Sequence, residues 1–450
     1  MSKIPLTAVR EYYTPELTKF LQDLGKIAAG INIVEMVTPV NAKACREKWM
    51  ELARHGRWTN PSFKYDLDLL AKVAGLGSQL DDVLEGSDKV FATLSQDGGG
   101  EALRWMTSDR IEELEREIAI AEMVTNLTSD SWVSEMVRPL LPELVTDIYG
   151  APTTETVQEA YAYAKVLADG GGHDLADDDR RKEVRRKLNA VELTAEGIRE
   201  GFLWVARECG FAETRPVEIS DTATAIDVRD ASSKGAVVVI PRDRKISGTK
   251  LIQLCGHEIL CHWQDSERAA KVLPLLGSGA LKPAGERLYE GHAVFSDYHV
   301  RLLLGEKAQR QQLPFYILAI EAAKAGRSFG AVANELYRYI RPTKTTDEEA
   351  LAATWNTCFR VFRGSAGDQD NSKLRYAFTK DAAYFEGRML AEELHEQDLD
   401  SILQIATLSV DDVDILGEVV EFEHGVDDLA QLELMIQRLI QFMLGGEVAL

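Results

Sequence analysis

Hydrophobic residues recur at three- and four-residue steps through most of the first 213 positions, which is the period of an amphipathic helix. Pro15 suits the first turn of a helix, and apolar side chains follow at positions 17, 20, 21 and 24. The same period predicts helices over Asn41–Arg57, Leu67–Leu84, Ile111–Leu127, Thr153–Leu167 and Asp179–Cys209. We therefore expect residues 1–213 to form a mainly helical N-terminal region.

Two glycine-rich runs interrupt this helical pattern, at Asp97–Gly100 and at Asp169–Gly172. A phosphate-binding loop would follow a strand and would continue into a Gly-Lys-Ser/Thr sequence, and neither run does so. We interpret both runs as loops between helices.

After residues 214–216, hydrophobic residues recur at every second position, which indicates strands. Val217–Ile219 and Thr224–Val228 alternate, Asp230–Gly235 is a polar turn, and Ala236–Ile240 is a β-branched run that Pro241 closes. Ser247 then suits the N-cap of another helix, with apolar residues at 251, 252, 254 and 255. The pattern predicts a small sheet that leads directly into a helix.

Helices return in the remainder of the chain. Lys271–Pro283 is expected to be a loop, Glu286–Leu304 a helix, and residues 314–342 amphipathic and helical. The acidic residues 396–450 end in an amphipathic helix, which we interpret as a packing or partner helix without chemistry. Its apolar positions are Leu432, Met435, Ile436, Leu439 and Phe442.

Composition narrows the class of protein. The 450 residues are 45% hydrophobic and 28% charged, as in soluble globular proteins. No run approaches eighteen apolar residues, and the first residues lack an apolar signal core, so we expect neither a membrane span nor secretion. Five scattered cysteines indicate a reducing compartment, and we expect a cytoplasmic protein.

The formal net charge of -22 argues against binding to nucleic acid or to an anionic membrane surface. The same charge would repel a strongly acidic polypeptide substrate unless a local basic patch outweighs it. Nothing in the pattern indicates the oligomeric state.

The strongest chemical signal is the stretch from His257 to His262, with the sequence HEILCH, together with Glu290. Catalytic zinc takes neutral imidazoles and a carboxylate and keeps a fourth position for water. A further carboxylate beside that water can accept its proton. We interpret His257, His262 and Glu290 as ligands of Zn²⁺ and Glu258 as the general base.

The spacing of the two histidines is unusual. Zinc peptidases commonly place them four residues apart, on one helical face, whereas His257 and His262 are five apart. On a regular α-helix, five residues rotate the second side chain roughly 140° away from the first. Both imidazoles can reach one ion if the helix contains an extra residue, so we predict a π-bulge near Leu260 and Cys261.

Other residues compete for these roles. Cys261 lies four residues after His257 and could offer a thiolate, although free cysteines are more often small buried hydrophobes. Glu286 lies one turn before Glu290 and is a rival third ligand. His292 and His299 are interpreted as surface or hydrogen-bonded core histidines. Asp297 is interpreted as an exposed residue or as a group that steadies a ligand histidine.

A peptidase also needs groups that bind its substrate. Val237–Ile240 could pair as an edge strand with an extended peptide, or could be an ordinary buried strand. Arg360, Arg363 and Lys380 could bind a terminal carboxylate, and Tyr384 could steady an oxyanion. For each of these four, a surface ion pair or simple packing is the competing interpretation.

Taken together, these stretches resemble the tyrosine-carboxypeptidase-like metallopeptidases. The eukaryotic members of that family remove the C-terminal tyrosine of α-tubulin, and bacterial relatives carry a Gln-Glu-Gly-Leu-Ala motif. The family's His-Glu-Ile-Gly-Thr-His motif stands here at 257–262, and its Glu-Gly-Leu-Ala element at 290–293. Arg360–Gly364, Phe378–Asp381, Tyr384–Gly387 and Asn60–Tyr65 look like further family blocks. The resemblance spans roughly residues 55–395 and implies that Glu290 is the third ligand.

This chain departs from the family pattern at four positions. Leu260 and Cys261 replace Gly and Thr, and Tyr289 and His292 replace Gln and Leu. The candidate ligands are retained, so the departures affect the choice of substrate more than the binding of metal.

The sequence therefore predicts an α+β, predominantly helical protein with a zincin-like metallopeptidase domain. We expect a helical N-terminal region over residues 1–213, the catalytic domain over 214–395 and an acidic helical segment over 396–450. The predicted activity is zinc-dependent carboxypeptidase cleavage of a peptide or protein C-terminus, and the resemblance implies an aromatic terminal residue. The alternatives are an inactive protein-interaction module on the same fold, and an endopeptidase or aminopeptidase.

Overall fold

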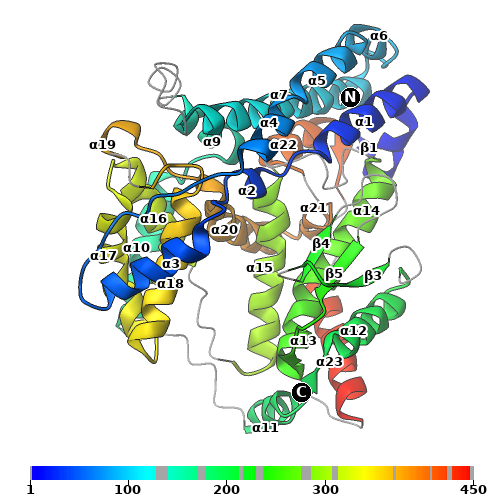
Figure 1. Cartoon of the computed structure of the whole chain (residues 1–450). Helices are drawn as coiled ribbons and strands as arrows, with labels where there is room; N and C mark the ends of the chain where they lie inside the picture. Colours follow the sequence, from blue (N-terminus) through cyan, green and yellow to red (C-terminus); the bar gives the residue numbers. More distant parts are fainter. Residues whose placement is uncertain are drawn as a thin grey trace.

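The structure is a computed structural model that describes residues 3–127, 140–169, 179–211, 216–223, 226–229, 237–274, 285–306, 313–367, 371–405, 408–422 and 428–445. Helices dominate the described part of the chain, with short strands beside them (Figure 1). An α+β, predominantly helical fold is therefore confirmed. No helix among these residues is both long and apolar enough to cross a membrane.

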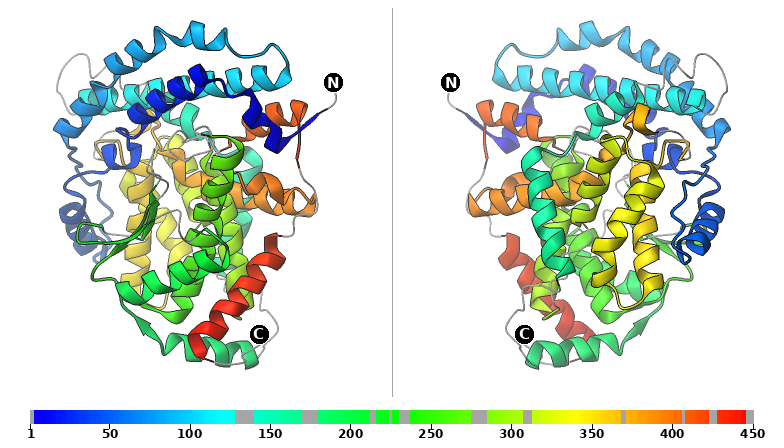
Figure 2. Two further views of the ribbon diagram at one scale, coloured as in Figure 1. Left: turned by 90° about the vertical axis from the view of Figure 1, so that its right-hand side faces the viewer. Right: turned by 90° about the vertical axis from the view of Figure 1, so that its left-hand side faces the viewer.

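The N-terminal region contains strand β1 and a series of helices. They are β1 (Ile4–Pro5), a 3₁₀ helix (Leu6–Tyr12), α1 (Pro15–Ala28), α2 (Ile33–Met36), α3 (Ala42–Ala53), α4 (Leu67–Ala74), α5 (Gly77–Leu84), α6 (Ser87–Phe91), α7 (Gly98–Leu127), α9 (Leu141–Tyr149), α10 (Thr154–Ala168), α11 (Asp179–Asn189) and α12 (Ala195–Glu208). Helices α1 and α4–α7 form a layer across one end of the molecule, as Figures 1 and 2 show from three sides.

The middle of the chain contains the sheet and the central helices. These elements are β2 (Glu192–Leu193), β3 (Val217–Ser220), β4 (Asp227–Arg229), β5 (Val237–Pro241), β6 (Ile246–Ser247), α13 (Gly248–Leu254), a π-helix (Cys255–Trp263), α14 (Gln264–Val272) and α15 (Glu286–Leu303). The side chain of Ser247 accepts a hydrogen bond from the backbone N–H of Lys250 at 3.3 Å, so the predicted N-cap is confirmed.

The last third is again helical. It comprises α16 (Leu313–Lys324), α17 (Phe329–Ile340), a 3₁₀ turn (Arg341–Thr343), α18 (Asp347–Phe362), α19 (Asn371–Leu374), a second 3₁₀ turn (Thr379–Asp381), α20 (Ala382–Glu396), α21 (Asp400–Leu403), α22 (Val410–Val419), β7 (Val420–Glu421) and α23 (Asp428–Leu444). Helix α23 is the predicted packing helix, because Leu432, Ile436 and Leu439 are buried in a hydrophobic core.

Strand β5 lies in the centre of a three-stranded sheet with the order β3-β5-β4. It pairs in parallel with β3 and antiparallel with β4. Of the two interpretations of Val237–Ile240, the edge strand is therefore wrong, because its backbone hydrogen-bonding groups are used on both sides. The ordinary buried strand is confirmed, since Val238, Val239 and Ile240 are buried. Within the described residues, β3 and β4 are the outer strands of this sheet, and β4 contacts the π-helix.

The prediction of a loop at the first glycine run, Asp97–Gly100, is also wrong. Gly98–Gly100 do not form a loop but begin α7, where the Asp97 carboxylate accepts the backbone N–H of Gly100 at 3.2 Å. A Cβ at Gly98 would lie 2.4 Å from Val419, and one at Gly99 would lie 2.7 Å from the Tyr12 ring. Glycine thus permits close packing of this helix start. Of the second run, residues 170–172 lie outside the described residues.

Other differences concern the lengths of elements. Leu67–Leu84 divides into α4 and α5, and Asp179–Cys209 divides into α11 and α12 around β2. Residues 212–215, 224–225, 230–236 and 275–284 lie outside the described residues. They include most of the predicted boundary at 214–216, the predicted polar turn and most of the predicted loop at Lys271–Pro283.

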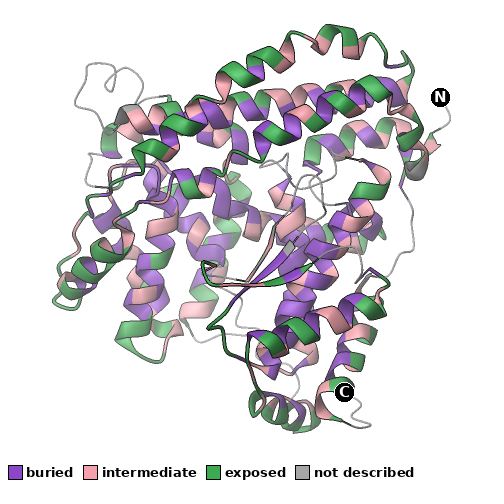
Figure 3. Cartoon of the chain, turned by 45° about the vertical axis from the view of Figure 1, so that its right-hand side comes forward, coloured by how far each residue is buried: buried purple, intermediate pink, exposed green. Residues whose placement is uncertain are grey.

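Three hydrophobic cores hold the elements together, and each combines residues from distant parts of the sequence. The first packs Trp49 and Val145 against Phe329 and Phe378, and the second packs Leu24 against Phe295 and Leu403. The third packs Phe202 and Trp263 against Ile436. Figure 3 shows that buried residues concentrate on the inward faces of the helices. Helix α15 contributes to all three cores and forms the centre of the fold.

Candidate metal centre and active site

The two histidines lie on a π-helix, so the predicted departure from α-helical geometry is confirmed. It extends over nine residues, Cys255–Trp263, and is longer than the single bulge expected near Leu260. A π-helix closes its hydrogen bonds between residues five apart, so such residues lie on the same side of the helix. The five-residue spacing of His257 and His262 therefore places both imidazoles on the same face.

Glu290 from α15 completes a compact group with these two histidines. One potential ligand atom from each of the three side chains lies within 4.8 Å of the others. Glu290 Oε2 is 4.0 Å from His257 Nε2 and 3.7 Å from His262 Nε2. The imidazole rings meet edge to face, with centroids 4.8 Å apart and planes at 88°. The sequence-predicted ligand set thus converges at one point.

The chemistry of this group fits a catalytic divalent metal ion. Two imidazole nitrogens and one carboxylate oxygen are a ligand set of zinc hydrolases. Metal binding requires neutral imidazole, and burial, followed by the neighbouring His257, holds the pKa of His262 well below its ordinary value. Only one face of the group needs to stay open for water, and His257 and Glu290 are both partly exposed.

Glycines allow the helices that carry the ligands to approach closely. A Cβ at Gly256 of the π-helix would lie 2.8 Å from the Val300 side chain of α15. A Cβ at Gly291 would lie 2.3 Å from the backbone of Gly387 in α20. Because contacts this short leave no room for a side chain, the two glycines set the position of Glu290 relative to both neighbouring helices.

The rival ligands are not part of this group. Among the described residues, the group that could hold a metal comprises the two histidines and Glu290, without Cys261 or Glu286. The carboxylate of Glu286 instead forms an ion pair with Lys380, and Cys261 is buried. Burial raises the pKa of Glu286, while Lys380 acts in the opposite direction.

The four residues predicted to bind substrate gather around Asp381, although they differ in their closest partners. Arg360 makes a two-point ion pair with the buried carboxylate of Asp381, with 2.8 Å between Nε and Oδ2. Arg363 is buried, stacks on the Phe378 ring at 4.7 Å and has Nη2 3.7 Å from Asp381 Oδ2. Burial alone would raise the pKa of Asp381, but the charge and hydrogen bonds of Arg360, together with the charges of Arg363 and Lys380, outweigh burial and lower it. Asp381 therefore anchors both arginines.

Lys380 and Tyr384 lie closer to the candidate ligands. The charge of Lys380 is one of the causes that lower the pKa of His262. Burial, followed by the carboxylate of Glu290, raises the pKa of Tyr384 well above its ordinary value. The Tyr384 hydroxyl consequently remains a hydrogen-bond donor at neutral pH. Arg360 also lies over the Tyr384 ring, 5.6 Å from its centroid.

The remaining candidates on α15 have structural partners. His292 is a hydrogen-bonded core histidine, as predicted, with Nδ1 2.7 Å from Asp265 Oδ2. Asp297 is buried, not exposed, and accepts from Arg301 Nε at 3.0 Å. The ring of His299 packs against Phe295 with centroids 4.6 Å apart. Asp265 is not among the residues predicted from the sequence, although its place one turn after His262 is a usable signal.

Two blocks far apart in the sequence meet beside this site. The Tyr65 hydroxyl accepts the backbone N–H of Gly364 at 2.9 Å and donates to the carbonyl of Ser365. Asn60 Oδ1 accepts the backbone N–H of Gly330 at 2.8 Å. The segment Asn60–Tyr65 thus braces the end of α18, which carries Arg360, and the start of α17.

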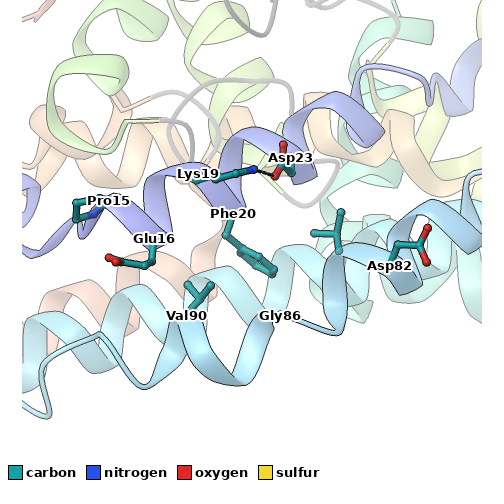
Figure 4. Close-up of a pocket in the computed structure, with 9 residues that line it drawn as sticks. Pro15, Glu16, Lys19, Phe20, Asp23, Asp82, Gly86 and Val90 are labelled. Carbon is teal, nitrogen blue, oxygen red and sulfur yellow. Dashed lines mark hydrogen bonds and ion pairs between the residues drawn. The ribbon is translucent and has the colours of Figure 1, made fainter.

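A groove between α1 and the α5–α6 pair lacks this chemistry. It encloses about 580 Å³ and is lined by Phe20, Val83 and Val90 together with acidic residues. Figure 4 shows Lys19 reaching toward Asp23 at its rim, where the two form an ion pair at 2.6 Å. None of the candidate catalytic residues lines this groove.

Comparison with known protein families finds a match. The sequence model of the family described as microtubule-associated tyrosine carboxypeptidase matches residues 143–425, which include the three candidate ligands, Glu258 and the four candidate substrate-binding residues. No curated protein matches the chain.

Proposed function

The chain belongs to the microtubule-associated tyrosine carboxypeptidase family, and we propose that it is a zinc-dependent metallocarboxypeptidase. Its substrate would be the C-terminus of a peptide or protein, with an aromatic terminal residue as the family description suggests. The observation that carries the proposal is the convergence of His257, His262 and Glu290 within 4.8 Å, with Glu258 between the two histidines.

His257, His262 and Glu290 would hold the ion. When bound, zinc supplies Lewis acidity and lowers the pKa of a coordinated water toward about 7. Glu258 would accept a proton from the attacking water and return it to the leaving amine. The order of the elements, with a sheet before the ligand helix and a glutamate on a later helix, favours a zincin-like catalytic domain over residues 214–395.

Lys380 is our choice for the group that binds the terminal carboxylate of the substrate. All three cations have a carboxylate partner, but Lys380 is the one whose charge is among the causes that lower the pKa of His262. Glu286 holds the ammonium of Lys380 in place. Tyr384 would donate a hydrogen bond to the oxyanion that develops on the scissile carbonyl.

The peptide backbone would pair with β4 and not with β5. Strand β4 lies at one edge of the sheet and contacts the π-helix, whereas β5 has a partner on each side. Addition of the substrate as a further strand would align its last residues along the helix that carries Glu258.

The test compares Glu258→Gln with Glu267→Gln, a control on the neighbouring helix α14. We expect wild type and both variants to bind one zinc ion, measured by elemental analysis. Glu258→Gln should lose at least about 100-fold in hydrolysis of peptides with a free C-terminus, whereas the control should retain wild-type turnover. Wild-type turnover in Glu258→Gln would refute the mechanism.

The same assay separates the alternatives. Peptides with an amidated C-terminus should resist cleavage, because the carboxylate that Lys380 would bind is absent. Cleavage of amidated peptides would indicate an endopeptidase or aminopeptidase. A wild-type protein that cannot take up zinc would instead support an interaction module without catalysis.

A further inference from the structure

Tyr289 lies directly against the candidate ligand His262. The ring centroids are 4.0 Å apart and the planes are inclined at 31°, which is a stacked arrangement with a moderate tilt. On the same imidazole, the ring of His257 makes the edge-to-face contact at 4.8 Å. Two aromatic contacts therefore restrict the orientation of the His262 ring.

No hydrogen bond holds His262 in the part of the chain that the structure describes. Its Nε2 atom is the nitrogen that faces Glu290, at 3.7 Å from Oε2. The other nitrogen, Nδ1, is buried and has no hydrogen-bond partner there. Metal-binding histidines usually donate this second N–H to a carboxylate or a carbonyl, which sets the ring orientation. For His262, the orientation of the ring therefore has to be set by packing against neighbouring side chains.

We infer that Tyr289 is a positioning residue, whose ring holds the His262 imidazole with Nε2 directed at the metal site. This inference rests on the proposed role of His262 as a ligand. A bound cation makes imidazole electron-poor, and the electron-rich face of a phenol ring favours such a partner. Tyr289 and Glu290 are consecutive residues of α15, so one helix provides both the third ligand and the stacking ring.

The position of Tyr289 is itself well defined. Gly291, two residues later, lies against the backbone of Gly387, so the N-terminal half of α15 cannot shift toward α20. The partly buried Tyr289 ring also packs against the second hydrophobic core.

The test measures metal affinity and not turnover. Zinc dissociation constants, obtained by competition with a chelator, are compared for wild type, Tyr289→Leu, Tyr289→Met and Tyr289→Phe. We expect the leucine and methionine variants to bind zinc about tenfold more weakly. The phenylalanine variant should stay within about twofold of wild type, because it keeps the ring. The visible spectrum of the cobalt-loaded protein should change in the first two variants only.

Tyr298→Leu is the matched control. Tyr298 lies on the same helix, but its ring packs under Arg388, 4.8 Å from the guanidinium, and not against a candidate ligand. Its loss should leave both the zinc dissociation constant and the cobalt spectrum unchanged. Unfolding of the metal-free proteins in urea shows whether each variant folds. If Tyr289→Leu does not fold, the comparison of Tyr289→Met with Tyr289→Phe still tests whether the ring positions His262.

The outcomes are distinguishable. A wild-type protein that binds neither metal ends the proposed function, and this inference ends with it. A wild-type protein that binds zinc no more tightly than Tyr289→Leu and Tyr289→Met refutes the stacking role alone. Weak binding by Tyr289→Phe would assign the effect to the hydroxyl and would likewise overturn the inference.

Discussion

Gly387→Ala should separate the two helices that shape the candidate site. A Cβ at this position would lie 1.9 Å from the backbone oxygen of Arg287 and 2.9 Å from the Cα of Gly291. Tolerable contacts begin near 3.4 Å, so α15 and α20 would have to move apart by about 1.5 Å. Both obstacles are backbone atoms, and no side chain can rotate out of the way. We therefore expect a loss of about 3 kcal/mol in the free energy of unfolding, at the upper end for overpacking.

The same displacement should impair catalysis. Glu290 lies on α15 and Tyr384 on α20, and a misplacement of about 1 Å costs on the order of 100-fold in rate. Urea unfolding measures the loss of stability, and hydrolysis of a free C-terminal peptide measures the loss of activity. Gly25→Ala is the control, because a Cβ inside α1 meets nothing within 4 Å and alanine favours a helix by about 1 kcal/mol. A Gly387→Ala protein with the urea midpoint of wild type would refute the reasoning.

Three further predictions concern charge and helix ends. Burial raises the pKa of Glu113 from 4.5 to about 7, so the folded state binds the proton more tightly than the unfolded state. Its contribution to stability should fall by about 3 kcal/mol as the pH rises from 4.5 to 7, and Glu113→Gln should remove this slope from urea midpoints measured across that range. Asp381→Asn should cost about 3 kcal/mol in urea unfolding, because Arg360 and Arg363 lose their buried counter-charge, and an unchanged midpoint would contradict the anchoring role. Thr346→Ala should cost about 1 kcal/mol by thermal unfolding, because it removes the capping box at the start of α18.

The candidate ligands and the irregular helix between them could be predicted from the sequence. Spacing alone shows that His257 and His262 cannot share an ion on a regular α-helix, and the π-helix resolves this conflict. The choice of Glu290 over Glu286 depended mainly on the family resemblance, because one helical turn separates the two. The structure separates them by their partners, since Glu286 forms an ion pair with Lys380.

Several features were accessible only through tertiary contacts. The order β3-β5-β4 places the most hydrophobic strand in the centre, and a β-branched run does not reveal which neighbours it has. The glycines at 98–100 were interpreted as a loop, because the contacts with Tyr12 and Val419 come from distant segments. Asp265 was missed, because its partner His292 lies 27 residues away and on another helix.

The sequence by itself determined the helical character of the chain and the residue types of the candidate metal centre. Both follow from local patterns, in which the period of hydrophobic residues and the distance between two histidines are visible within a few turns. The tertiary structure decided which charges are available to a substrate. Asp381 pairs with two arginines where α18 packs against the second 3₁₀ turn, and Glu286 pairs with Lys380 where α15 approaches the segment that leads into α20. Such long-range distances arise from how the helices pack around shared cores, and no local pattern encodes them.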